Sequence, residues 1–350
     1  MTREWIVTSA VSIALSLSQV GRADFEPTSE GATSPTAQLC DSCNDCDGPC
    51  DCRRPCGLLG RLGCDDERDC GFYDGCCCKG RLLGLFAPSD CRFTDFISPM
   101  TNPVFFEDPR NLTEARVIFL NHQIPGAVLG GGTMQVLVTQ LRAAITERLS
   151  VIATKDGYIW ADSNAPPIAG WANVNLGLKY NLYADPAQQR LLSIGTRYEM
   201  PVGSYSALQG NSKTGQFDMF LTGGTQLGEL SHFVSAAGFR LAENPHVLND
   251  QFYWSAHLDR RLRNRPIYGL LEFNWYHWMT NVAGGPSFGG LDLYNFGSNG
   301  VAGTNIVTGA FGLKYKPSPG IEMGVCWEVP LTSRRDILDN RITADLILRY

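Results

Sequence analysis

The residues of this chain that could carry chemistry are, first of all, cysteines gathered in one stretch of the N-terminal third. The first four follow the pattern Cys40-x2-Cys43-x2-Cys46-x3-Cys50, a spacing that can hold an iron–sulfur cluster. Asp51 stands where that pattern has proline, and no second run supplies the ligand that each cluster borrows. We therefore expect no cluster, and no other cofactor is predicted.

A zinc or soft-metal site around Cys76, Cys77 and Cys78 is a second option, because thiolates select soft ions. Residues 24–100 contain no histidine, and no CxxC is followed by one, which excludes haem attachment. We therefore predict structural disulfides, within one molecule or between neighbours, in a segment too poor in apolar residues to build a core. The candidates are Cys40, Cys43, Cys46, Cys50, Cys52, Cys56, Cys64, Cys70, Cys76, Cys77, Cys78 and Cys91.

The remaining cysteine, Cys326, is predicted to be a free thiol on the water-facing side of a strand. The five histidines occur on different strands or loops, and no flanking motif marks a nucleophile. We therefore predict that the protein is not an enzyme, with a hydrolase at the rim of the molecule as the weakest alternative.

Charged residues of both signs recur at alternate positions of the C-terminal two thirds. They predict either a polar pore or an interior filled by paired charges, without strong selectivity for one sign of ion. The predicted pore-lining residues are Lys179, Arg197, Glu199, Arg240, His257, Asp259, Glu272, Lys314, Glu322, Glu328, Asp345 and Arg349.

The elements that must position these charges are β-strands. In residues 171–183, apolar side chains alternate with asparagine and lysine, and no charge occurs on the apolar face. Residues 133–155 alternate less cleanly, which predicts a bulge or a partly apolar interior. We expect twelve strands, at about 112–121, 133–144, 147–155, 171–183, 190–202, 215–227, 231–242, 251–260, 266–279, 304–316, 321–330 and 341–350.

The connections alternate in length, being long after odd strands and short after even strands, as in an outer-membrane barrel with long external loops and short periplasmic turns. Aromatic residues fall near both ends of these strands and predict two girdles at the membrane interfaces. The class predicted is an all-β, antiparallel, up-and-down transmembrane β-barrel, preceded by a Cys-rich irregular tail.

The N-terminus reads as a signal peptide of residues 1–23, with an apolar stretch too short to span a membrane as a helix. Residues 24–98 then form a Cys-rich periplasmic tail, and residues 99–350 form the barrel. The net charge of −6 and the pI near 5.4 argue against nucleic acid as a partner.

The final residues, 342–350, alternate and end on Tyr350, which resembles the signal that directs bacterial outer-membrane β-barrels to their insertion machinery. Residues 112–350 as a whole resemble a twelve-stranded barrel of this class, and residues 98–110 are similar to bacterial envelope proteins of no known activity. The resemblance implies a Gram-negative outer membrane, with lipid and the barrel-assembly machinery as partners.

The function expected is a porin-like channel for passive diffusion of small polar solutes. The alternative is a structural envelope protein, in which the barrel anchors a tail that cross-links to itself or to other envelope proteins through disulfides. Whether residues 93–110 plug the pore is left open by the sequence.

Overall fold

The structure, a computed structural model, describes residues 81–350 except residues 129, 164–167, 211–212 and 264. The predicted signal peptide, the tail cysteines up to Cys78 and the metal sites considered for them lie outside the described residues.

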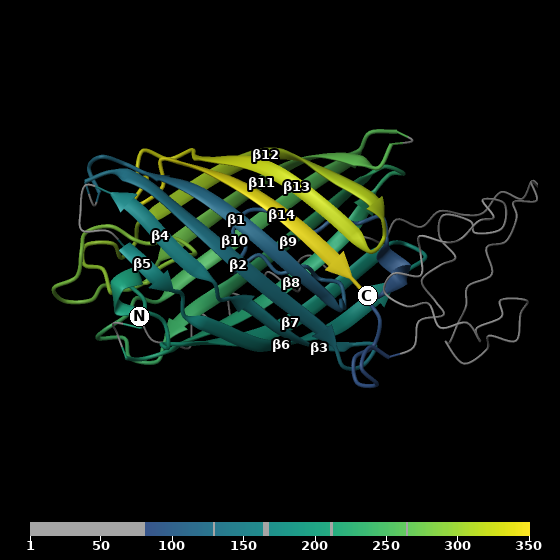
Figure 1. The fold of residues 1–350 in the computed structure, drawn as a ribbon, viewed down its shortest axis with the longest axis horizontal. Coiled ribbons are helices and arrows are strands. Elements are labelled where there is room, and N and C mark those ends of the chain that lie inside the picture. The colour runs from purple at the N-terminus through teal and green to yellow at the C-terminus, as the bar shows by residue number, and fades with distance from the viewer. Residues whose placement is uncertain (1–80, 129, 164–167, 211–212, 264) are drawn as a thin grey trace, which may run out of the picture. The chain divides into compact units, whose positions relative to one another are not determined.

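Twelve strands form a closed antiparallel barrel, which confirms the predicted fold class (Figure 1). Neighbours in sequence are neighbours in the sheet, and the last strand pairs with the first, from Glu114 opposite Arg349 to Gln123 opposite Asn340. The barrel strands are β1 (Glu114–Ile124), β2 (Gly132–Ala144), β3 (Leu149–Lys155), β6 (Val174–Asp185), β7 (Arg190–Met200), β8 (Gln216–Leu227), β9 (Ser231–Ala242), β10 (Gln251–Arg261), β11 (Ile267–Trp278), β12 (Asn305–Ser318), β13 (Ile321–Pro330) and β14 (Asn340–Arg349).

Two further strands that the sequence did not predict, β4 (Tyr158–Ser163) and β5 (Ile168–Trp171), extend the hairpin of β3 and β6. Strand β2 pairs first with β4 and then with β3, with a register that shifts by one residue between them. The break falls at Gly157, whose φ of +115° is open to glycine but strained for other residues. The irregular pattern of residues 133–155 therefore has two causes, this bulge and the burial of Val136 and Val138 inside the barrel.

Gly157 should be the glycine least tolerant of substitution in this hairpin, because an added Cβ would lie 2.2 Å from the Leu137 carbonyl oxygen. We expect Gly157→Ala to lower the free energy of unfolding by about 2 kcal/mol or more. Gly269→Ala on β11, where an added Cβ meets nothing within 4 Å, is the matched control. Urea unfolding of each refolded variant, monitored by the gel shift of the closed barrel, measures the two stabilities. Equal urea midpoints for Gly157→Ala and Gly269→Ala would contradict the strain argument.

The strands bury charge and expose apolar side chains, the reverse of a soluble fold. On β13, Ile321, Met323, Val325 and Trp327 are exposed to the outside, whereas Glu322, Cys326 and Glu328 are buried inside. The same alternation holds on β6. An uncharged apolar outer surface is suited to lipid, and a polar interior is typical of membrane barrels.

The two ends of the barrel differ. The connections 145–148, 186–189, 228–230, 262–266 and 319–320 are tight and share one end with Tyr350, which we call the turn end. The opposite loop end carries the long connections, including 201–215, with the short 3-10 helix η4 (Tyr205–Ala207), and 279–304. In the described part of the chain no helix has the length and apolar character needed to cross a membrane.

Candidate functional site

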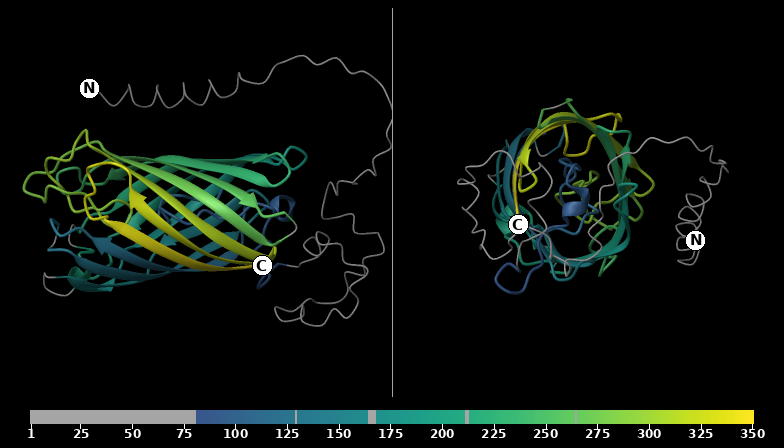
Figure 2. Two further views of the ribbon diagram at one scale, coloured as in Figure 1. Left: turned by 90° about the horizontal axis from the view of Figure 1, so that it is seen from above. Right: turned by 90° about the vertical axis from the view of Figure 1, so that its right-hand side faces the viewer.

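The lumen of the barrel is occupied by the chain's own segment 93–111, which we call the plug. It begins at the last residue of the 3-10 helix η3 (Cys91–Phe93) and is visible inside the ring of strands in the end-on view of Figure 2. Its side chains Phe93, Phe96, Ile97, Phe105 and Phe106 are at most 1% exposed. The interior of this barrel therefore holds a polypeptide segment as well as side chains from its wall.

The plug enters and leaves by the same end of the barrel. The Asp90 N–H donates to the Asn111 carbonyl at 2.9 Å, so the two arms of the plug lie side by side at the turn end. Deep in the lumen the chain reverses at Asn102, whose φ of +49° is one that asparagine tolerates well. Its carbonyl accepts from the Phe106 N–H at 2.8 Å, which closes the turn.

Arg110 forms an ion pair within its own arm of the plug and also joins the two arms. The Arg110 guanidinium lies 2.7 Å from Asp108 and donates to the Phe96 carbonyl at 2.8 Å. Burial would raise the pKa of the Asp108 carboxyl, but Arg110 and Lys179 outweigh it and hold that pKa well below its usual range. The plug is thus a hairpin that carries its own charge pair.

The wall holds the plug mainly by polar contacts to its backbone. Glu272 accepts from the N–H groups of Met100 and Thr101 at 2.7 and 2.6 Å. Lys314 and Arg197 donate to the carbonyls of Ser98 and Val104. Further wall side chains that bind plug atoms are Arg116, Gln140, Ser193, Thr222 and Ser255.

One plug carboxylate, Glu107, is buried among three wall cations. Arg142 donates to both of its oxygens, at 2.8 and 2.9 Å, and Lys179 donates at 2.8 Å, while Arg197 lies 4.0 Å away. Burial opposes ionisation, but the charges of Arg142 and Lys179 lower the Glu107 pKa to about 2. A lowered pKa stabilises the plugged state above the ordinary glutamate value of about 4.3, and this contribution is lost only as the pH falls through about 2.

A chain of alternating carboxylates and imidazoles holds the plug near its N-terminal arm. His232 lies between Asp95 of the plug, at 3.4 Å from its Nε2, and Asp259, at 2.9 Å from its Nδ1. His257 lies between Asp259, at 3.1 Å, and Glu272, at 2.7 Å. With an acidic group at every ring nitrogen, each imidazole fits best as a cation that donates from both nitrogens.

The groups that face His232 favour the same state. The Phe96 ring packs on the imidazole with centroids 4.6 Å apart, a contact that a cation strengthens. Asp95 also accepts from Arg261 and Tyr268, both at 2.8 Å, and these contacts help to lower its pKa despite burial. Strand β8 places the uncharged Gln226 opposite His232.

We therefore expect the plug to loosen as the pH rises through the range in which histidine titrates. A neutral His232 would turn a lone pair toward Asp95, so the stabilisation is present at low pH and lost at high pH. Hydrogen exchange of amides 95–106, corrected for the intrinsic effect of pH on exchange, measures this loosening. The protection factors of these amides should fall by up to about tenfold per pH unit, whereas those of the strand amides should not. Asp95→Asn should reduce this fall, because an amide can donate to the neutral His232 ring. His246→Gln, on an exposed loop, should leave the fall unchanged.

The loop end is closed by the connection 279–304, which folds inward. Leu291, Leu293 and Tyr294 are buried, and Asp292 accepts from Arg341 of β14 at 2.9 Å. Arg240 donates to the Tyr294 carbonyl at 3.3 Å. The lumen is thus filled from both ends by parts of the same chain.

The structure places all twelve predicted pore-lining side chains inside the barrel, where they form ion pairs with the plug, with one another or with other side chains of the wall. Examples in which both partners were predicted are Arg240 with Glu199, Lys314 with Asp345 and Arg349 with Glu322. Sequence reasoning missed Glu107, Arg142, His232 and Asp218 as members of this network. Alternation in β2, β8 and β9 marks three of them as inward-facing, but Glu107 lies in a segment without periodicity.

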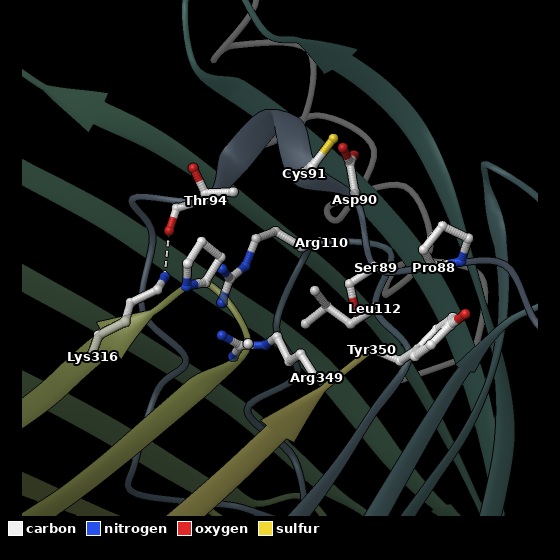
Figure 3. Close-up of a pocket in the computed structure, with 12 residues that line it drawn as sticks. Pro88, Ser89, Asp90, Cys91, Thr94, Arg110, Leu112, Lys316, Arg349 and Tyr350 are labelled. Atoms are coloured by element: carbon white, nitrogen blue, oxygen red, sulfur yellow. Dashed lines mark hydrogen bonds between the residues drawn. The ribbon is translucent and has the colours of Figure 1, made fainter. Parts of the chain in front are cut away.

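The turn end gathers the chain's last residues and the base of the plug around a small open pocket of about 30 Å³ (Figure 3). Cys91 and Tyr350 line it, and Lys316 donates to the Thr94 carbonyl. Arg349 donates to Glu114 of β1 at 2.6 Å and to the Ser98 hydroxyl of the plug at 2.7 Å, and it also pairs with Glu322. In the part of the chain described, Cys326 forms no disulfide and packs beneath Met100.

A closed antiparallel barrel of twelve strands, apolar outside and charged inside, is the fold of the bacterial outer-membrane β-barrel proteins. The chain is similar in structure to an outer membrane channel from Pseudomonas putida F1, with 11% identity and a TM-score of 0.52 over 73% of this chain and 100% of that one. It is also similar to the KdgM porin, with 9% identity and a TM-score of 0.39 over 67% and 99% of the two chains. A third similar structure is the translocator domain of the autotransporter NalP from Neisseria meningitidis, with 10% identity and a TM-score of 0.42 over 68% and 87%.

At these identities the similarity establishes the fold. No family model matches the sequence, and no curated protein matches it.

Proposed function

We propose that the protein is a channel of the bacterial outer membrane that is closed at rest by its own N-terminal segment. When the plug withdraws, small polar solutes would diffuse through the polar lumen. The observation that carries this proposal is the path of the plug, a folded hairpin that fills the lumen and has both arms at one mouth. Such a hairpin can leave without threading a chain end through the barrel and without unpairing a strand.

The orientation proposed follows from the two ends of the barrel. Short turns face the periplasm in outer-membrane barrels, which would place the turn end, the base of the plug and the N-terminal tail there. The strand that ends at Tyr350 would be the one recognised by the assembly machinery. The tail would then be available to partners in the periplasm that pull on the plug or hold it.

Conductance in planar lipid bilayers tests the channel. Because Asp90 and Asn111 are hydrogen-bonded neighbours, residues 91–110 can be replaced by a linker of a few glycines that leaves the barrel ends in place. We expect the full-length protein to be closed for most of the recording and this plug-replaced variant to conduct continuously. A plug-replaced barrel that refolds, as judged by its gel shift, but carries no current would contradict the proposal.

A second candidate is a structural protein whose barrel only anchors the tail in the envelope. It is favoured by one observation, that side chains of β1, β2 and β6 to β14 all bind the plug, which is more attachment than a briefly closed gate requires. Non-reducing electrophoresis of isolated envelopes distinguishes the two. A ladder that collapses on reduction supports the anchor, and monomer alone contradicts it.

A further inference from the structure

The three cations around Glu107 come from one stretch of the wall, in which β6 pairs with β7 and β3 separates β6 from β2. Arg142 is on β2, Lys179 on β6 and Arg197 on β7, and each side chain is at most 3% exposed. Arg142 presents its guanidinium edge to the carboxylate through Nε and one terminal nitrogen, at 2.8 and 2.9 Å. This two-point geometry is the one by which arginine recognises planar carboxylates.

The wall supplies fewer negative charges than these cations require. Glu114 accepts from Arg142 at 2.9 Å, and Asp218 pairs with Arg197 at 2.5 Å. In the described chain, the two hydrogen bonds that Lys179 makes both go to plug atoms, the Glu107 carboxylate and the Asp108 carbonyl. When the plug leaves, three cations face two carboxylates, and Lys179 has lost its partners.

Glu107 is the plug carboxylate that supplies the missing negative charge. Asp108 cannot do so because it is paired with Arg110 of the plug itself, and Asp95 is bound at the histidine chain. A buried cation without a counter-charge is unfavourable, so the vacated wall site would attract an anion in place of Glu107. The shape that it fits is the one that occupies it now, a carboxylate on a short aliphatic stem.

We propose that Arg142, Lys179 and Arg197 form a lumenal binding site for the carboxylate of a small organic acid, and that Glu107 of the plug occupies this site when no solute does. This inference rests on the proposed channel function and names its solute class. Solute and plug then compete for one site, so a carboxylate that reaches the lumen favours the released plug, and an unoccupied site favours closure.

Butyrate and its neutral twin butyramide test the site in the plug-replaced variant. We expect millimolar butyrate to reduce the chloride current with a saturable half-effect concentration, and butyramide to have no effect at the same concentration. Arg142→Gln in the same background should raise the half-effect concentration about tenfold or more, because a two-point charged contact is lost. Lys155→Gln removes a lumenal cation that pairs with Glu199 instead, and should change it less than about threefold.

Two results would overturn the inference. One is equal block by butyrate and butyramide, and the other is an equal effect of Arg142→Gln and Lys155→Gln, which would indicate a general response to lumenal charge. If the plug-replaced variant carries no current, the channel function is contradicted, and calorimetric titration of that variant with butyrate then decides the site. Binding that Arg142→Gln abolishes would support the site, and no binding would contradict it.

Discussion

Glu107→Gln should convert a barrel that is closed at rest into one that opens often. The substitution keeps the size of the side chain but leaves Arg142 and Lys179 buried without the charge that now pairs with them. Removing one partner of a buried ion pair costs about 3 to 5 kcal/mol, which corresponds to at least about a hundredfold shift toward the released plug. In bilayer recordings the open fraction should rise accordingly, and amides 95–106 should exchange faster by a similar factor.

The control for this variant is Glu243→Gln, the same substitution at an exposed loop glutamate that binds Tyr198 and the Gly215 N–H outside the lumen. Its open fraction should stay that of the wild type. If Glu107→Gln remains closed while its plug amides exchange at the wild-type rate, the ion cluster is not what holds the plug.

The second large effect is expected at the loop end. In the plug-replaced variant the connection 279–304 still narrows the lumen through Asp292 and Tyr294. The Val282 N–H donates to the Ser298 carbonyl at 2.9 Å, so residues 283–297 can be replaced by a short Gly-Ser linker with little movement of the barrel. Conductance of the doubly trimmed barrel should be several-fold higher than that of the plug-replaced barrel alone.

A point substitution gives a milder version of the same test. Asp292→Asn weakens the pair with Arg341, which keeps Glu328 at 2.7 Å as its other partner. It should increase the flicker of the open channel, whereas Asp339→Asn should not, because Asp339 and Arg335 form an exposed pair. Identical conductance in the singly and doubly trimmed barrels would show that the loop is not a constriction.

The barrel was predictable from the sequence because its signal is local. In a strand with one face toward lipid and the other toward a polar lumen, the side-chain pattern repeats every two residues. Strands β6 and β13 show this pattern without exception on their apolar faces. The hairpin β4–β5 escaped prediction because Gly157 interrupts the alternation at the point where the register shifts. The number of barrel strands and the alternation of long and short connections could be predicted without knowing which residues are in contact.

The plug could not be derived in the same way. Residues 93–111 have three prolines and no period, and they are ordered by partners far away in sequence, such as Glu107 by Lys179 and Ser98 by Lys314. The sequence showed which charges face inward on most strands. It could not show that Glu107, a carboxylate outside the strands, would lie among three inward-facing cations. That arrangement depends on which strands the closed barrel brings together around the plug.

Arg349 joins the earliest and the latest parts of this barrel to be synthesised. Its guanidinium contacts Ser98 of the plug, Glu114 at the start of the first strand and Glu322 beside the last one. Sealing of the cylinder and docking of the plug therefore share one side chain. A barrel with an undocked plug would keep the contacts of Arg349 with Glu114 and Glu322 and lose the one with Ser98, so docking of the plug adds a hydrogen bond at the seam between the first and the last strand.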